Sequence, residues 1–215
     1  MRRTTRGLRQ RLARLVLRLC GWTVETPAPE APKYVLVVAP HTSNWDFPWG
    51  YLGKVTLGLH LNWMGKHTLF RWPYGWFMRW LGGIPVDRRG RHNLSQQMAA
   101  VFARRERLVL AIMPEGTRSY TKGWKTGFYY IALAAQVPLA LGYIDYRRKA
   151  MGISEPFYPS GNLEADLQRI REFYADKIGR YPEKTGEIAI LPSSRPAPVA
   201  ADGRSATMEN VRKAS

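Results

Sequence analysis

The chain of 215 residues has a formal net charge of +17 at pH 7 and contains a single cysteine, Cys20. Its length fits one domain with a full hydrophobic core, and one cysteine excludes an intrachain disulfide or a cysteine-based metal cluster. The excess of arginine and lysine favours a polyanionic partner, which means nucleic acid, an anionic membrane surface or a phosphorylated substrate. Eight tryptophans in this length favour the membrane, because tryptophan is enriched at the bilayer interface.

Residues 1–24 are predicted to form a basic amphipathic helix. The first 21 residues hold seven arginines and no acidic residue. At helical spacing, one apolar stripe contains Leu8, Leu12, Leu15, Val16 and Leu19, and its flanks carry Arg9, Arg11, Arg14 and Arg18. Leu17 falls outside the stripe. Arginines beside an apolar stripe are typical of a helix that lies in the headgroup layer of a membrane. The alternatives are a cleavable targeting peptide and a helix packed on the domain.

The rest of the chain predicts a linker, one main domain and a tail. Residues 25–33 are proline-rich and predict a linker, residues 34–191 form the main domain, and residues 192–215 are predicted to be disordered. Within the domain, strands are expected at 34–39, 61–66, 84–88, 107–113 and 138–146, and helices at 46–58, 73–83, 93–106, 126–135 and 163–174. This alternation predicts an α/β fold with a single, mostly parallel sheet flanked by helices.

The longest apolar stretch of the chain does not predict a membrane span. It runs from Phe128 to Ile144, but Gln136 and Pro138 interrupt it. A continuous run of about 20 apolar residues is needed to cross a bilayer as a helix. We therefore expect a buried helix followed by a buried strand.

A histidine and an aspartate stand five residues apart in the stretch VVAPHTSNWDF, directly after the first predicted strand. Residues five apart do not share a helix face, so His41 and Asp46 can meet only if His41 precedes the helix. Ser43 is a good N-cap, which would make Asp46 the third helical residue. An imidazole held by a carboxylate suits general-base catalysis. Alternatively, Ser43 and Asp46 form an ordinary capping box and His41 is a surface residue.

Two further stretches place arginines at the expected ends of strands. GGIPVDRRG brings Arg88, and MPEGTRS brings Glu115 to Arg118, with Lys122 and Lys125 shortly after. Several arginines at neighbouring strand ends can converge on one phosphate through forked, charge-assisted hydrogen bonds. Gly116 permits close approach of the backbone. Each arginine alone is more often solvated, and Glu115 with Arg118 is equally compatible with a salt bridge inside the turn.

The order HTSNWD, GGIPVDR, PEGTRS and VPLAL resembles the PlsC-type glycerophospholipid acyltransferases, which include the lysophosphatidic acid acyltransferases. The likeness spans roughly residues 34–145, and the PEGTR run at this distance from the histidine makes it specific. The resemblance implies a PlsC-like acyltransferase fold for residues 34–191. It implies that His41 and Asp46 are catalytic. It further implies that Arg88 and Arg118 hold the phosphate of the acceptor, with Glu115 ordering the loop. Together with the nearby Lys125, the expected substrate-binding residues are Arg88, Glu115, Gly116, Thr117, Arg118 and Lys125.

The activity implied by the resemblance is O-acyl transfer to the free hydroxyl of a lysophospholipid, with 1-acylglycerol 3-phosphate as the preferred acceptor. His41 would remove the proton of the hydroxyl, and acyl-CoA or acyl-carrier protein would supply the acyl group as co-substrate. The resemblance implies no metal and no cofactor. Glycerol 3-phosphate and a lyso-aminolipid are the alternative acceptors.

Two classes of protein outside this family compete with the acyltransferase interpretation. A serine lipase or thioesterase would need a nucleophile elbow, and the sequence contains no G-x-S-x-G. A non-catalytic module for nucleic acid or anionic lipid rests on the charge alone, without a recognisable binding motif. We expect an anionic membrane surface as partner and no nucleic acid. The expected location is peripheral or monotopic on the cytoplasmic face of the cell membrane.

A second membrane contact is expected near the middle of the chain. Trp72, Trp76 and Trp80 are spaced four apart and would share one face of a short helix that starts at Pro73, with Arg71 and Arg79 beside them. Such a face is either a bilayer anchor or an ordinary core stripe, and the arginines favour the anchor.

Overall fold

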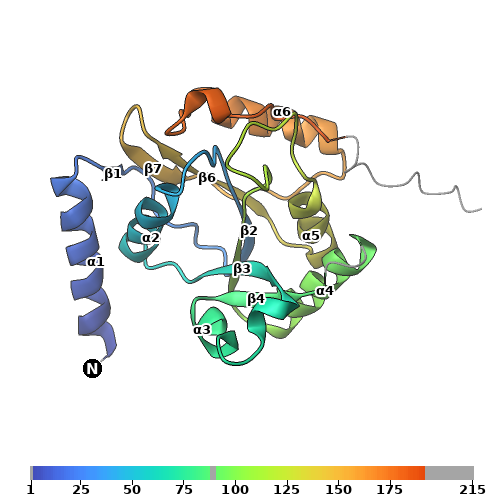
Figure 1. Ribbon diagram of the computed structural model, residues 1–215, viewed down its shortest axis with the longest axis horizontal. Coiled ribbons are helices and arrows are strands. Elements are labelled where there is room, and N and C mark those ends of the chain that lie inside the picture. The colour runs from blue at the N-terminus through green and yellow to red at the C-terminus, as the bar shows by residue number, and fades with distance from the viewer. Residues whose placement is uncertain (1, 88–90, 192–215) are drawn as a thin grey trace, which may run out of the picture.

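The computed structural model describes residues 2–87 and 91–191, which form an α/β fold around one sheet (Figure 1). The sheet has seven strands in the order β1-β7-β6-β2-β5-β3-β4. Every neighbouring pair is parallel except β6 and β7, which are antiparallel. The predicted single, mostly parallel sheet is therefore confirmed.

The centre of the sheet is made of three strands buried on both faces. They are β2 (Lys33–Val38), β5 (Leu108–Ile112) and β6 (Leu139–Asp145). Alternate residues of β2 contribute to two different cores, with Val35 and Val37 on one face and Tyr34 and Leu36 on the other. Continuous apolar runs such as VLVV are typical of strands with helices on both sides.

Helices cover both faces of the sheet (Figure 1). One face carries α4 (Arg91–Arg104), α5 (Gly127–Ala135) and α6 (Leu163–Tyr174). The other carries α1 (Arg2–Leu19) and α2 (Asp46–Thr56). The remaining elements are β1 (Thr23–Val24), β3 (Leu61–Lys66), η1 (His67–Phe70), α3 (Gly75–Trp80), β4 (Gly83–Val86), β7 (Ala150–Ile153) and η2 (Pro182–Lys184).

The apolar run from Phe128 to Ile144 is a helix, α5, followed by a buried strand, β6, as expected. Within the described ranges 2–87 and 91–191, we find no helix with the length and apolar character needed to cross a bilayer. Strands β1 and β7 were not expected from the sequence. They are only two and four residues long and add the antiparallel edge next to β6.

Helix α1 packs on the domain and still exposes its apolar stripe. Leu17, which lies outside the stripe, is 1% exposed and packs in a cluster with Trp22 and residues of α2, and Ala13 is also buried. By contrast, all five stripe residues, Leu8 to Leu19, are exposed, and so are the four flanking arginines. The alternative of a helix packed on the domain is thus realised by one face of α1, and the membrane contact expected of the exposed face stays a prediction.

The tryptophan segment is not part of the core. Trp72, Trp76 and Trp80 are 94%, 71% and 74% exposed, which rules out the core-stripe alternative. The helix is shorter than expected, since α3 begins at Gly75 and Trp72 precedes it. Pro73 cannot donate a backbone hydrogen bond, and the first bond of this turn runs from the Gly75 N–H to the Arg71 carbonyl.

The predicted division into helix, linker, domain and tail stays a prediction. Strand β1 lies before the proposed linker and pairs with β7, so the sheet draws on residues ahead of position 34. The predicted disordered tail, 192–215, lies outside the described residues.

Candidate active site

The candidate site lies where two central strands end side by side. Strand β2 ends at Val38 and leads through Pro40 to His41, and its neighbour β5 ends at Ile112 and leads to Glu115. Parallel neighbours end at the same edge of a sheet, so the two loops meet. The His41 backbone N–H donates to the Glu115 carboxylate oxygen Oε2 at 2.9 Å, which joins the two loops.

His41 and Asp46 form the expected pair. The distance from His41 Nδ1 to Asp46 Oδ2 is 2.9 Å. The same carboxylate oxygen accepts the backbone N–H of Ser43 at 3.1 Å, and the other, Oδ1, accepts the hydroxyl of Tyr146 at 2.8 Å. Asp46 is buried, whereas the His41 side chain is 20% exposed. The carboxylate is thus fixed on both oxygens while the imidazole keeps access to solvent.

The local backbone differs from the expected capping arrangement. Helix α2 begins at Asp46 itself, and the residue at its N-cap position, Trp45, makes no side-chain capping bond. The expectation that Ser43 caps the helix and that Asp46 is its third residue is therefore wrong. Ser43 instead shapes the turn, because its hydroxyl accepts the Trp45 N–H and its backbone N–H binds Asp46.

The geometry determines which nitrogen of His41 is free for chemistry. An ionised carboxylate only accepts hydrogen bonds, so the proton shared with Asp46 belongs to Nδ1. Nε2 then carries the lone pair and can take a proton from a substrate. A carboxylate next to Nδ1 also stabilises the imidazolium that forms. This arrangement can act as a general base.

Glu115 is a buried carboxyl group, at 5% exposure, beside the pair. Burial raises the pKa of Glu115, and the negative charge of Asp46 adds to this, while the hydrogen bond and charge of His41 oppose it. The alternative of a salt bridge between Glu115 and Arg118 is not realised among the described residues, since Glu115 binds the His41 backbone. Glu115 therefore positions the loop that carries His41.

The turn after β5 brings the other expected residues close to His41. The exposed Arg118 donates a hydrogen bond from its guanidinium to the Asn44 side chain, inside the His41–Asp46 turn. Thr117 accepts the Ser119 N–H through its hydroxyl. Gly116 has φ +68°, and a Cβ there would lie 2.7 Å from the Lys125 ammonium nitrogen. Arg118 and Lys125 thus supply two positive charges at this edge.

Arg88, the other expected phosphate ligand, lies outside the described residues. Its neighbour Asp87 follows β4 and exchanges two hydrogen bonds with the Gln97 side chain on α4. Among residues 2–87 and 91–191, no three or more histidine, cysteine, aspartate or glutamate side chains lie together as metal ligands would.

Comparison with known proteins identifies the family of the chain. A family model described as Acyltransferase matches residues 23–140, which is more than half of the chain. The chain belongs to the acyltransferase family. Among solved structures, the 1-acyl-sn-glycerophosphate (LPA) acyltransferase PlsC from Thermotoga maritima is similar, with 18% identity, 80% of this chain and 79% of that chain covered, and a TM-score of 0.48. A comparison with curated protein sequences gives no match.

The acyltransferase domain contains site residues that the sequence did not reveal. Tyr146 lies 100 positions after Asp46 and reaches it only because β6 ends beside β2. Asn44 lies inside the HTSNWD stretch and could have been identified there. Arg180 lies over the rings of Trp45 and Tyr146, at 5.3 and 5.9 Å from their centroids, and so adds a third cation near the pair.

Residues 174–181, near the end of the domain, contact the turn that carries His41 and the strand before it. The Tyr181 N–H donates to the Thr42 hydroxyl at 3.1 Å. A Cβ at Gly179 would lie 2.7 Å from the same hydroxyl oxygen, so glycine is needed for this close approach. The hydroxyl of Tyr174 donates to the carbonyls of Val37 and Gly142, which tie α6 to β2 and β6.

Proposed function

We propose that this member of the acyltransferase family transfers an acyl chain from acyl-CoA or acyl-carrier protein to the free hydroxyl of a lysophospholipid. The preferred acceptor is 1-acylglycerol 3-phosphate, and the product is phosphatidic acid. The observation that carries the proposal is the His41 imidazole held through Nδ1 by the buried Asp46 carboxylate, next to two exposed cationic side chains.

The reaction begins with proton transfer to His41. Nε2 takes the hydroxyl proton as the acceptor oxygen attacks the thioester carbonyl carbon. The tetrahedral intermediate then collapses, the carbon–sulfur bond breaks, and the thiolate leaves with the electron pair. The imidazolium returns its proton to the thiolate. A general base of this kind contributes about 10²–10⁴ in rate, and the rest comes from holding two substrates in register.

The roles of the carboxyl groups follow from their contacts. Asp46 orients the ring and stabilises the imidazolium, and Tyr146 and Ser43 hold its two oxygens in place. Glu115 fixes the backbone of His41 by accepting its N–H. The reaction as written needs no metal and no cofactor beyond the acyl donor.

The phosphate of the acceptor is assigned to the loop after β5. Arg118 is exposed, and its only described hydrogen bond goes to the neutral side chain of Asn44, so a phosphate could replace that partner with a stronger, charged one. Lys125 adds a point charge against Gly116. Arg88 is proposed as the second arginine that binds the phosphate, because of its position at the end of the GGIPVDR stretch.

The enzyme is proposed to work at the cytoplasmic face of the cell membrane. The support is the exposed apolar stripe of α1 with its arginines and the exposed Trp72, Trp76 and Trp80. Exposed aromatic and leucine side chains next to arginine suit the interface between headgroups and acyl chains. A lipid acceptor would reach the site from that surface.

The test is acyl transfer by the purified protein, offered several lysolipids with acyl-CoA and with acyl-carrier protein. His41→Ala should abolish transfer, and Asp46→Asn should lower kcat by about 10²–10⁴. His60→Ala is the matched control, because His60 is exposed and lies outside the site. Normal turnover by a folded His41→Ala protein would overturn the proposed chemistry.

The acceptor class is tested with Arg118→Ala. Loss of one charged partner of a phosphate should cost about 2–5 kcal/mol of transition-state stabilisation. The value of kcat/KM for 1-acylglycerol 3-phosphate should fall accordingly. With a lyso-aminolipid, which has no phosphate, the same variant should behave as the unmodified protein. Equal losses with both acceptors would show that Arg118 holds Asn44 and not the substrate.

A further inference from the structure

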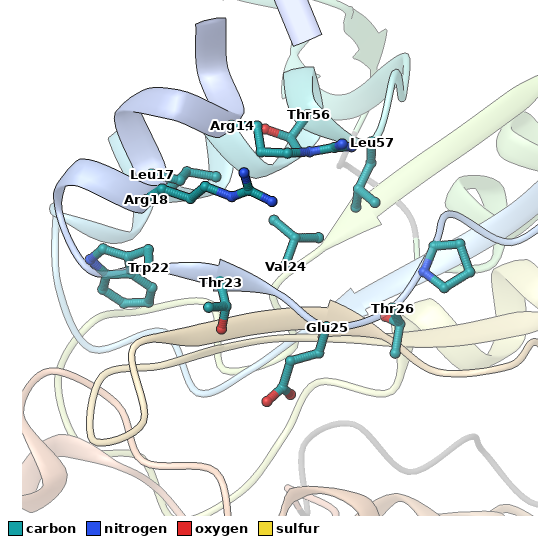
Figure 2. Close-up of a pocket in the computed structure, with 11 residues that line it drawn as sticks. Arg14, Leu17, Arg18, Trp22, Thr23, Val24, Glu25, Thr26, Thr56 and Leu57 are labelled. Atoms are coloured by element: carbon teal, nitrogen blue, oxygen red, sulfur yellow. The ribbon is translucent and has the colours of Figure 1, made fainter. Parts of the chain in front are cut away.

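A pocket of about 380 Å³ lies away from the histidine, between α1, the strand β1 and the end of α2 (Figure 2). Arg14, Leu17 and Arg18 line it from α1, Val24 from β1, and Thr56 and Leu57 from the end of α2. Helix α2 runs from Asp46 to Thr56, so at about 1.5 Å per residue the pocket end at Thr56 lies roughly 15 Å from the catalytic carboxylate. It is a separate site.

The pocket has an unbalanced positive charge. Arg14 and Arg18 are one helical turn apart, and Figure 2 shows both side chains extending from α1 across the pocket. Neither has an acidic partner among the described residues. Glu25 also lines the pocket, but its carboxylate is bound by the Tyr143 hydroxyl and by Arg148. In Figure 2 that carboxylate points away from the two arginines.

A hydroxyl group without a partner lies at the same place. Thr56 is 3% exposed, and its Oγ1 is buried without a hydrogen-bond partner among the described residues. A buried donor left unpaired costs about 1–3 kcal/mol. Thr56 and Arg14 are both among the side chains that line the pocket (Figure 2).

We propose that this pocket binds the phosphate headgroup of an anionic phospholipid. Two arginines suit a phosphate, and the partly exposed apolar side chains of Val24 and Leu57 give the glycerol and the start of an acyl chain a surface to contact. A phospholipid is favoured over free phosphate as the ligand because another face of α1 carries the exposed apolar stripe. That stripe would place the helix in the headgroup layer of a membrane. The site does not depend on the proposed catalysis.

The test compares two pairs of arginines on the same helix. Arg14→Gln with Arg18→Gln changes the pocket, whereas Arg9→Gln with Arg11→Gln removes the same charge from exposed positions that do not line it. Binding of monomeric dihexanoyl phosphatidylglycerol is measured by titration calorimetry and by the shift in thermal unfolding. Dihexanoyl phosphatidylcholine and inorganic phosphate are the comparison probes. Arg118→Ala separates this pocket from the active site, because it should leave the affinity unchanged.

The expected result is at least tenfold weaker binding of phosphatidylglycerol by the pocket pair, with little change for the exposed pair. Thr56→Val keeps all charges and should leave the free protein folded but weaken lipid binding several-fold. Equal losses in both arginine pairs, or no binding by the unmodified protein, would overturn the site. Inorganic phosphate bound as tightly as the lipid, with the same dependence on Arg14 and Arg18, would overturn the lipid assignment. None of these measurements requires turnover, so failure of the proposed function would not affect them.

Discussion

Asp46 receives hydrogen bonds from three residues in two segments of the chain. His41 and Ser43 donate from the turn before α2, and Tyr146 donates from the loop after β6. A carboxylate with donors on both oxygens cannot rotate without losing one of them. The ring of Tyr146 is itself held edge-on against Trp22, at 5.2 Å between centroids. The orientation of the proposed catalytic pair therefore depends also on residues that lie far from it in the sequence.

Tyr146→Phe should isolate the contribution of that hydroxyl. The ring contact with Trp22 is kept, but Asp46 Oδ1 loses its donor. A hydrogen bond to a charged group contributes about 1.5–3 kcal/mol, so kcat should fall roughly tenfold to a hundredfold while KM for both substrates stays the same. Tyr51→Phe, on the exposed side of α2, is the control. An unchanged kcat would mean that His41 and Ser43 alone hold the carboxylate.

Glu115→Gln should change how stability depends on pH. Burial raises the pKa of Glu115 in the folded protein above its value of about 4.3 in the unfolded chain. The protonated form therefore favours folding at low pH, and this contribution is lost as the pH rises through the folded pKa. Glutamine cannot ionise but can still accept the His41 N–H.

Chemical denaturation of both proteins from pH 4 to pH 8 checks this prediction. The free energy of unfolding of the glutamine variant, relative to the unmodified protein, should increase as the pH rises and then level off. Other titrating groups are common to both proteins and cancel. A difference that does not change with pH would show that Glu115 titrates as it does in the unfolded chain.

Among the elements, the turn after β5 depends on one glycine. Gly116 has φ +68°, and Lys125 occupies the space that a side chain would fill. Gly116→Ala should therefore lower the free energy of unfolding by about 1–2 kcal/mol and reduce acyl transfer, because Lys125 and Glu115 move. Gly127→Ala is the matched control, since no atom lies within 4 Å of its Cβ position at the start of α5. Equal effects of the two substitutions on stability and activity would contradict this role.

Helix α1 offers a second matched pair. Leu17 is 1% exposed and Leu15 is 52% exposed. Leu17→Ala should lower the free energy of unfolding by about 2–5 kcal/mol because it removes a buried side chain. Leu15→Ala should change stability by about 0.5 kcal/mol or less but weaken binding to vesicles. Denaturation and vesicle co-sedimentation of both variants check the two effects, and the same loss of stability in both would contradict the packing of α1 on α2.

At the scale of the whole molecule, two surfaces are proposed to contact the membrane by different forces. The arginines of α1 act through charge, which salt screens. Trp72, Trp76 and Trp80 are uncharged and act through burial in the interface. The two contributions should therefore respond differently to ionic strength.

Vesicle co-sedimentation at low and high salt separates them. Replacing Arg9, Arg11, Arg14 and Arg18 with glutamine should cost about 1 kcal/mol each on anionic vesicles at low salt, roughly a thousandfold in total, and little at high salt. Replacing the three tryptophans with serine should weaken binding at both salt concentrations, and on zwitterionic vesicles as well. Undiminished pelleting of the arginine variant at moderate salt would place the membrane contact elsewhere.

The sequence by itself determined the features that depend on neighbours along the chain. The apolar run VLVV predicted β2, the alternation of strands and helices predicted the mostly parallel sheet, and the spacing of His41 and Asp46 required a turn before α2. The four motif stretches led to the family that the comparison confirmed. These are local patterns, set by periodicity, proline and glycine, and they are written in consecutive residues.

Only the tertiary structure decided which distant residues meet. Tyr146 holds Asp46 because β6 lies beside β2 in the sheet, and Leu17 is buried because α1 packs on α2 through a face other than its apolar stripe. The same holds for the start of α2, where the Asp46 carboxylate accepts hydrogen bonds from Ser43, His41 and Tyr146 in place of the expected cap. Such contacts follow from strand order and helix packing, which no periodicity in a single sequence encodes.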